Sequence, residues 1–376
     1  MIEIRQIENK RQLKQFVQFY YDLYRGCPQA VPYLFFDEMA TLDRRKNPSF
    51  ECCEADYFMA FRDGQPVGRV AAIINHRANE RWQVRQVRFG WFDFVDDLEV
   101  SRALLDAVGQ WGRRHGMTEM AGPLGFIDTD REGMLVEGFD ELSTMYVNYN
   151  YPYYADHISR LGGFVKDNDY LEYKVRVPEV VPDKFGKIAQ MVRQRYGLRV
   201  HKFTRHELLS EGYGRQVFDL LNQTYKDLYG FSQLSDRQID KLVNDYIKIA
   251  DLNLVTAIMD GSRMVGFGIT FPSFSQALQH TRDGRLWPMG WWHILRTLKW
   301  HKTDTVDLLL IGVLPEYRVK GANALIFDDL IRQFQRYGFR WAQAMPQMER
   351  NEAVRSQWQY LESIQHRRHR CFRKQL

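Results

Sequence analysis

Residues that could hold a phosphate group lie close together in the second half of the chain. Gly321 and Ala322 leave room for a bulky anion beside the backbone, and Arg318 and Lys320 add positive charge. An amphipathic helix is predicted directly after them, and a helix N-terminus offers N–H groups and the positive end of a dipole. The pattern therefore predicts an anion-binding loop, although ordinary capping of a basic helix entry would give the same residues.

The equivalent segment of the first half, residues 95–100, has the opposite charge. It carries Asp96, Asp97 and Glu99 and has no glycine. Carboxylates at a helix start cap the helix and stabilise its dipole, but they repel a pyrophosphate. We expect the first half to be silent toward such a ligand, and we favour capping over the rival interpretation of a bound metal or cationic substrate.

The elements that position these two segments repeat along the chain. A hairpin with an Asp-Gly turn is expected over 56–74 and again over 254–269. Each is followed by a strand, an amphipathic helix and a short strand. This order predicts an α/β fold of mixed, α+β-like character: two tandem domains, each a mixed, mostly antiparallel sheet flanked by helices.

A proline-bracketed stretch, residues 177–182, marks the expected boundary between an N-terminal domain (1–178) and a C-terminal domain (179–376). Two insertions break the symmetry, a Gly-rich one at 122–140 and a Trp-rich one at 272–303. The composition is that of a globular protein, with 45% hydrophobic and 26% charged residues.

The chain is expected to be cytoplasmic, because no signal-like or membrane-spanning run is seen. The four cysteines lack metal-type spacing, so neither a metal nor disulfides are expected. A net charge of +5 is too mild to predict nucleic acid as a partner.

The segment 308–321, LLLIGVLPEYRVKG, resembles the signature of the GCN5-related N-acetyltransferase (GNAT) superfamily. The resemblance covers most of 198–376 and, more weakly, 2–177. The runs 138–140 and 150–154 resemble a group of bacterial tandem GNAT-like proteins. The resemblance implies acetyl-CoA or another acyl-CoA as co-substrate, with its pantetheine arm along the 308–313 strand. The implied contact residues are Ile311, Gly312, Val313, Arg318, Val319, Lys320, Gly321, Ala322 and Asn323, where Asn323 replaces the family's small residue.

Candidate catalytic residues follow from the same resemblance. The family's acid is often a Tyr seven residues beyond an Asn; Asn351 matches that Asn, but Trp358 stands at the seventh position. Tyr360 is the nearest Tyr. A base must deprotonate the acceptor ammonium, and Asp307 and Glu352 are the candidates.

The leading hypothesis is a CoA-dependent N-acyltransferase for a small-molecule amine, with one active site in the C-terminal domain. Two alternatives stay open: a non-catalytic tandem module that binds a ligand or partner, and an aminoacyl or peptidyl transferase. The sequence leaves the oligomeric state undetermined.

Two further segments each have two interpretations. The Trp-rich insertion is either a membrane-surface helix or lid, or an element packed against the protein, and we favour packing. The tail 366–370, HRRHR, is expected to be a solvated edge strand rather than a nucleic-acid or metal site. The residues that define the insertion are Trp287, Trp291, Trp292, Leu295, Arg296, Leu298, Lys299, Trp300 and Lys302.

Overall fold

The computed structural model describes residues 1–351 and 357–376, which divide into two compact units. Unit 1 comprises Met1–Leu171, Phe274–Ile294 and His366–Leu376, and unit 2 comprises Glu172–Ser273 and Leu295–Gln365. Two long strands, β7 and β13, have residues in both units. Part of the Trp-rich insertion thus belongs to unit 1, although it lies within the sequence of the C-terminal half.

The sheet of unit 1 has the strand order β1-β2-β3-β4-β5-β13, and β6 pairs with β13. All of its described pairings are antiparallel except that of β4 with β5, which is parallel. The predicted hairpin is β2–β3, with its turn at Asp63 and Gly64, both at positive φ. The strands are β1 (Ile2–Gln6), β2 (Cys53–Arg62), β3 (Gln65–Asn75), β4 (Gln86–Phe94), β5 (Glu119–Gly122), β6 (Met134–Glu137), β7 (Val165–Arg176) and β13 (Ser363–Gln375).

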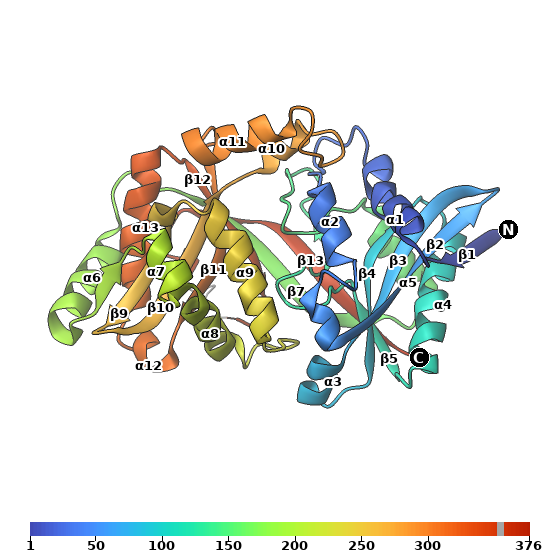
Figure 1. The fold of residues 1–376 in the computed structure, drawn as a ribbon, viewed down its shortest axis with the longest axis horizontal. Helices are drawn as coiled ribbons and strands as arrows, with labels where there is room; N and C mark the ends of the chain where they lie inside the picture. Colours follow the sequence, from blue (N-terminus) through green and yellow to red (C-terminus); the bar gives the residue numbers. More distant parts are fainter. Residues whose placement is uncertain (352–356) are drawn as a thin grey trace. The chain divides into compact units, whose positions relative to one another are not determined.

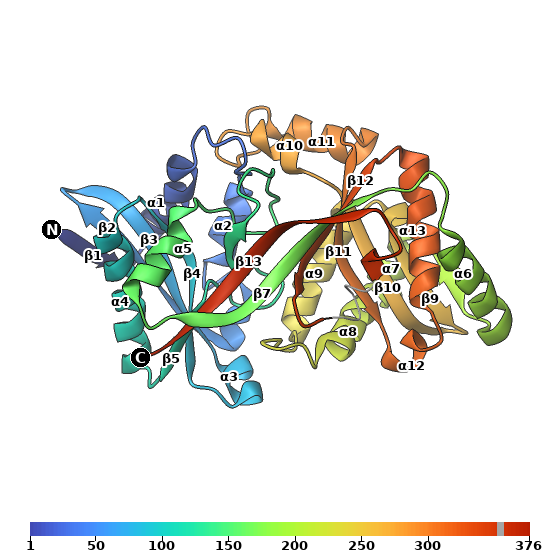
Figure 2. The same ribbon diagram turned by 180° about the vertical axis from the view of Figure 1, so that it is seen from behind.

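Helices cover both faces of this sheet (Figures 1 and 2). Val70 and Ala72 of β3 lie in the core with α4, whereas Arg69 points to the opposite face and binds the carbonyl of Phe16 in α1. Because successive residues of a strand face opposite sides, burial on both faces makes β3 a nearly continuous apolar run. The helices are α1 (Lys10–Leu23), α2 (Phe35–Thr41), α3 (His76–Trp82), α4 (Leu98–Arg114), α5 (Tyr153–Leu161) and α10 (Ser275–Gln279).

Unit 2 repeats the arrangement, with the strand order β8-β9-β10-β11-β12 followed by β7. The pairing of β11 with β12 is parallel, and those from β8 to β11 are antiparallel. The strands are β8 (Arg199–His201), β9 (Val255–Asp260), β10 (Arg263–Pro272), β11 (Thr305–Val313) and β12 (Trp341–Met348).

The two faces of the unit 2 sheet are covered by different helices. A Cβ on Gly268 would lie 2.7 Å from Ile326 of α13, whereas one on Gly312 would lie 2.8 Å from Thr224 of α8. Glycine therefore lets both helices approach the sheet closely. The helices are α6 (Asp183–Tyr196), α7 (Arg205–Ser210), α8 (Tyr213–Tyr225), α9 (Asp236–Ile249), α12 (Pro315–Arg318) and α13 (Asn323–Tyr337). Helix α11 (Gly290–Trp300) has its residues up to Ile294 in unit 1 and the rest in unit 2.

The C-terminal tail corrects one expectation. It forms strand β13 as predicted, but the strand is not a solvated edge, because β5 and β6 pair with it and His369 and Arg367 are buried. Arg368 and Arg370 donate to Asp169 of β7 at 2.9 and 2.7 Å. Burial opposes ionisation of Asp169, but these guanidinium groups hold its pKa at about 2. Arg368 and Arg370 of the basic tail are therefore engaged in ion pairs within the protein.

The Trp-rich insertion is packed only in part. Phe274 and Leu278, around α10, are buried as expected. Trp287 and Trp291 are 80% and 45% exposed. The expectation that Trp291 packs inside the protein is therefore wrong.

Candidate functional site

The loop between β11 and α13, which carries the predicted anion site, is folded onto itself. The N–H groups of Lys320 and Ala322 both donate to the Tyr317 carbonyl at 3.2 Å, and that of Gly321 donates to the Arg318 carbonyl at 2.9 Å. These bonds close a compact turn around α12. A pyrophosphate could use the same N–H groups only after they exchange their present partners, so binding here requires the loop to rearrange.

Gly321 is fixed by two features of this turn. Its φ is +85°, which favours glycine, and a Cβ would lie 2.8 Å from the Cγ2 atom of Ile188 on α6. The neighbouring Ala322 is buried. The small residues therefore serve packing against α6 as well as any approach of a ligand.

The charged groups of the loop differ in availability. Arg318 donates from Nε to the Val313 carbonyl at 2.7 Å, and this bond ties the loop to the end of β11. The Lys320 ammonium lies 4.4 Å from the Tyr317 ring centroid. Val319 is 88% exposed, and Asn323 is half-buried at the first turn of α13. The tip of the loop is thus open to solvent.

The edge of β11 that leads into this loop separates from β12. The parallel ladder ends at the pair Leu308 and Ala344, and β11 bulges at Leu309. Beyond the bulge, the Tyr225 hydroxyl of α8 donates to the Ile311 carbonyl at 3.1 Å. Burial raises the pKa of Tyr225, so its phenol stays neutral and can donate. Tyr225 could not be predicted from the sequence, because no local pattern links α8 to β11.

Two buried carboxylates lie on strands beside the point of separation. Asp307 of β11 pairs in register with Gln343 of β12, and the Gln343 amide donates to the Glu172 carboxylate at 3.5 Å. Glu172 belongs to the part of β7 that lies in unit 2, next to β12. Both carboxylates are almost fully buried. The sequence predicted Asp307 as a base and missed Glu172, whose burial is visible only in the folded sheet.

The other predicted catalytic residues belong to the segment that follows β12 in the chain. Tyr360 is 42% exposed, and the Lys184 ammonium lies 3.1 Å from its ring centroid. Asn351 follows β12 in a turn, where its N–H donates to the Met348 carbonyl. Glu352 lies outside the described residues.

Trp358, at the family's acid position, is part of the core. Its indole N–H donates to Gln347 at 3.0 Å, and its ring packs edge-on against Phe327 of α13. The side chain is 5% exposed. Trp358 therefore serves packing in this structure.

The corresponding segment of unit 1 has acidic caps. The Asp97 side chain accepts the Glu99 N–H at the start of α4 and forms an ion pair with Arg62 at 2.5 Å. Of the three carboxylates predicted to cap this helix, Asp97 does so, whereas Asp96 binds His157 at 3.0 Å and Glu99 pairs with Arg62 at 3.2 Å.

In unit 1, the space where β4 and β5 stop pairing is occupied by the protein's own backbone. The parallel ladder of β4 with β5 ends at Arg88, and the Leu124 N–H then donates to the Phe89 carbonyl at 2.9 Å. Arg88 also donates to the Gly125 and Phe126 carbonyls at 3.2 and 3.4 Å. The Gly-rich insertion thus occupies the edge of β4.

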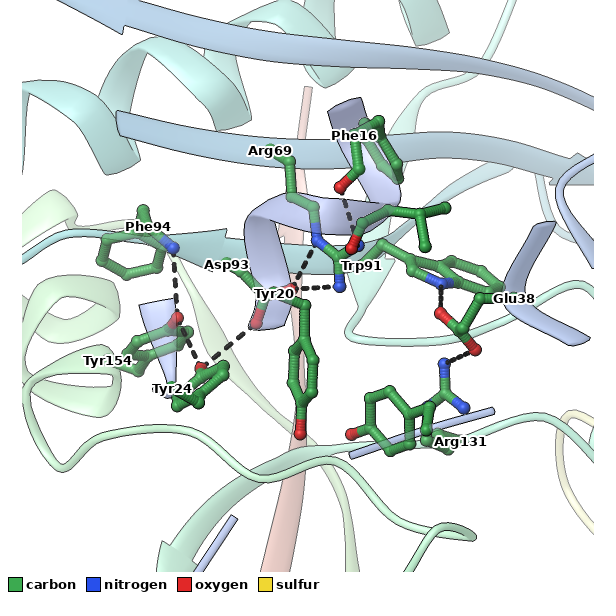
Figure 3. A network of polar contacts seen from close by, with 12 residues as sticks. Phe16, Tyr20, Tyr24, Glu38, Arg69, Trp91, Asp93, Phe94, Arg131 and Tyr154 are labelled. Atoms are coloured by element: carbon green, nitrogen blue, oxygen red, sulfur yellow. Dashed lines mark hydrogen bonds and ion pairs between the residues drawn. The ribbon is translucent and has the colours of Figure 1, made fainter. Parts of the chain in front are cut away.

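A buried polar network lies on the face of the unit 1 sheet that α1 covers, opposite the face covered by α4 (Figure 3). Arg69 binds Asp93 from Nε and a terminal nitrogen, both at 2.7 Å. The Tyr24 hydroxyl donates to Asp93 at 3.1 Å and lies 2.8 Å from the Tyr154 hydroxyl, which itself accepts the Phe94 N–H. Burial raises the pKa of both phenols well above the ordinary value. The network therefore holds one neutralised ion pair and two neutral phenols.

A second buried pair extends the network. Glu38 of α2 accepts from Arg131 at 2.6 Å and from the Trp91 indole at 2.8 Å, and Arg131 lies 3.6 Å from the Tyr33 ring centroid (Figure 3). The following residue, Glu132, has a pKa raised well above the ordinary value by burial and by the charge of Asp128. From the sequence, Arg131 and Glu132 were expected only as part of the Gly-rich insertion 122–140, and Glu38 was not predicted as a site residue.

Unit 1 also contains a cavity of about 350 Å³. Its walls include the rings of Tyr20 and Tyr24 from the end of α1 and the side chains of Arg25, Arg282 and Asp283. Arg25 reaches Asp283 at 3.4 Å. Tyrosine rings together with charged groups line a pocket that suits a polar small molecule. Among the described residues, no group of three or more His, Cys, Asp or Glu side chains could hold a metal ion.

Comparison with protein-family models finds no match. Two curated proteins are similar over most of the chain. Protein YghO of Escherichia coli (strain K12) is 26% identical over 381 residues, which cover 99% of this chain and 95% of that protein. A bacterial ceramide synthase of Caulobacter vibrioides (strain NA1000 / CB15N) is 25% identical over 326 residues, which cover 85% of this chain and 82% of that protein.

Solved structures are similar over the whole chain. A tandem GNAT protein from the clavulanic acid biosynthesis pathway superposes with a TM-score of 0.59 at 11% identity, covering 100% of this chain and 98% of that one. A GCN5-related N-acetyltransferase from Sphaerobacter thermophilus gives a TM-score of 0.51 at 12% identity, covering 100% of this chain and 95% of that one. At such identities the likeness concerns the fold.

Proposed function

This chain has the fold of tandem GNAT proteins, as its sequence predicted, and from this premise we propose that it transfers an acyl group from an acyl-CoA to an amine. The proposed site is in unit 2, where β11 separates from β12. We propose a long-chain amine as acceptor, because one relative is named a bacterial ceramide synthase.

One observation favours unit 2 over unit 1 as the location of the acyl-transfer site. Beyond Leu309, two side chains bind the carbonyls at the edge of β11. The Tyr225 hydroxyl donates to Ile311 at 3.1 Å, and the Arg318 guanidinium donates to Val313 at 2.7 Å. In unit 1 the same edge is paired through the backbone of Leu124. A side chain can rotate away to let an extended ligand pair with a strand edge, whereas displacing a packed backbone segment costs much more.

The residues present suit an acyl-CoA in part. The carbonyls of Ile311 and Val313 would accept from amide N–H groups of the pantetheine arm once Tyr225 and Arg318 leave them. Lys320 and the freed Arg318 would then face the pyrophosphate. The acyl-CoA supplies the acyl group as an activated thioester.

The chain supplies a base for the other substrate. An amine is protonated at neutral pH, and it must lose a proton before its nitrogen can form the new amide bond while the carbon–sulfur bond breaks. Asp307 or Glu172 would take that proton, because both are buried carboxylates beside the end of the β11–β12 ladder. As the amide forms, the nitrogen loses a second proton, and water or the Tyr225 phenol would pass this proton to the departing thiolate, which leaves as the free thiol.

The experiment measures free thiol released from acetyl-CoA and from palmitoyl-CoA, with sphinganine and a panel of short amines as acceptors. We expect release with palmitoyl-CoA and sphinganine. Val319→Glu adds a negative charge at the loop tip without strain, whereas a side chain on Gly321 would strain the turn. We expect Val319→Glu to weaken CoA binding about ten-fold.

The matched control is Val180→Glu, since Val180 is equally apolar and 78% exposed outside the loop. Calorimetry should show one CoA site per chain, which Val180→Glu leaves unchanged. Two equal CoA sites, or equal CoA affinity of the two variants, would contradict the assignment to unit 2. Intact CoA binding without thiol release for any amine would contradict catalysis.

The cavity of unit 1 favours a second candidate function, the binding of a polar small molecule without catalysis. Its Tyr20 and Tyr24 walls are held by the buried network, so the pocket is preformed. Saturation-transfer NMR with a library of polar metabolites would test it. If saturation-transfer signals of a metabolite persist in the variant Tyr24→Ala, which lacks part of the cavity wall, the metabolite does not bind in this cavity.

A further inference from the structure

Large apolar side chains are exposed together in one short segment. Trp287, Met289, Trp291 and Trp300 are 80%, 56%, 45% and 47% exposed. Elsewhere in the described part of the chain, no more than two large exposed apolar side chains fall within a stretch of this length. Scattered apolar residues on a surface are ordinary, whereas several within one segment mark an interaction site.

The same segment carries only positive charge. Residues 284–303 include two arginines and two lysines and no Asp or Glu. Arg296, Lys299 and Lys302 are exposed, and none forms an ion pair with a residue that the structure describes. In contrast, Arg285 is held by Asp283 at 3.0 Å. Three cations are therefore available to an external anion.

Helix geometry places Trp291 and Lys299, one side chain of each kind, on the same side of α11. Trp291, Leu295 and Lys299 follow each other at intervals of four residues, which is one face of a helix. Thr297, on the opposite face, is buried. Trp287 and Met289 lie in the connection that leads directly into the helix (α11 in Figure 2).

From this arrangement we propose that residues 285–302 dock the protein on an anionic membrane surface. Tryptophan rings settle at the boundary between headgroups and acyl chains, and lysine and arginine attract anionic headgroups. A protein partner would need its own acidic, apolar groove, whereas a bilayer offers both features over any area. No helix in the described part of the chain is long and apolar enough to cross a bilayer, so the helix would lie on the surface.

The docking is independent of acyl transfer, since it needs no acyl-CoA. It would, however, bring the protein to a membrane, where a long-chain amine resides. The two proposals can therefore fail separately: vesicle binding is measured without substrates, and thiol release from palmitoyl-CoA with sphinganine is measured without vesicles.

The experiment is co-sedimentation of the full chain with vesicles of phosphatidylcholine alone or of equal parts phosphatidylcholine and phosphatidylglycerol. We expect binding only to the anionic vesicles, weakening as salt rises, and a blue shift of tryptophan fluorescence on binding. The double variant Trp287→Ser, Trp291→Ser should bind at least about ten-fold more weakly, and Lys299→Glu about five- to twenty-fold more weakly. Both variants should keep the wild-type circular dichroism and CoA affinity.

Matched controls come from exposed residues elsewhere. Phe36→Ser removes an exposed aromatic side chain, and Lys14→Glu reverses an exposed charge; both should bind vesicles like the wild type. Wild-type protein that stays in the supernatant, binding that ignores lipid charge, or full binding by a folded double Trp variant would each overturn the proposal.

Discussion

The buried ion pair of unit 1 allows a quantitative test of the structure (Figure 3). Arg69 is 1% exposed and binds Asp93 twice at 2.7 Å, and its other terminal nitrogen donates to the Phe16 carbonyl at 3.0 Å. Arg69→Met leaves the Asp93 carboxylate buried, and among the residues that the structure describes only the Tyr24 hydroxyl then donates to it. Removing one partner of a buried pair typically costs about 3–5 kcal/mol. We therefore expect Arg69→Met to lower the free energy of unfolding by this amount.

The assay is urea unfolding of the full chain, followed by tryptophan fluorescence and circular dichroism. Arg62→Met is the matched control, because Arg62 forms its ion pairs with Asp97 and Glu99 at the surface. An exposed pair contributes roughly 0–1 kcal/mol, so this control should change stability little. The double variant Arg69→Met, Asp93→Leu removes both charges and should recover part of the loss. If Arg69→Met costs no more than Arg62→Met, the ion pair is not buried as described and the reasoning fails.

The remaining predictions concern single side chains. Trp358→Tyr should lower stability by about 1–3 kcal/mol without raising the rate of thiol release, because the indole is a core residue; a faster enzyme would instead support an acid at this position. Tyr360→Phe should leave that rate within about two-fold, since the phenol lies on the surface; a loss of the ten-fold or more expected for a general acid would show otherwise. Asp169 has a pKa lowered to about 2, so its contribution to stability is complete above about pH 4 and is lost as pH falls toward 2. Asp169→Asn should therefore flatten the dependence of unfolding free energy on pH in this range, and an unchanged curve would refute the assignment. A hydrogen bond with Cys53 lowers the pKa of Cys52 to about 7, so iodoacetamide should modify Cys52 first at neutral pH, as read by mass spectrometry of the digested protein.

Local patterns were sufficient for much of the fold. The Asp-Gly turns and the alternation of apolar residues predicted both hairpins, and Gly338 ends α13 at positive φ as a helix C-cap should. The repetition of these patterns predicted two tandem domains. Each of these features depends on neighbours within a few residues, so the sequence displays them directly.

The expected sites were less complete, since a binding site joins residues that are distant in sequence. The residues from Ile311 to Asn323 form one strand end and loop, which their order in the chain guarantees. Tyr225 reaches Ile311 from α8, which packs against β11, and Glu172 reaches Gln343 because the sheet order places β7 next to β12. Likewise, Trp358 is buried because its ring packs against α13, whereas Tyr360, two residues later, is exposed; only the folded structure shows which of the two packs there.

The sequence by itself determined the elements and the charge of each loop, because hydrophobic periodicity, turn residues and charge act over short distances. The tertiary structure decided which of these charges remain available. Burial and pairing neutralise the basic tail through Asp169, whereas the cations of residues 296–302 are left to solvent beside exposed tryptophans. The two segments carry similar charge in the sequence, and only the packing around them separates an internal strand from a surface that can bind an external partner.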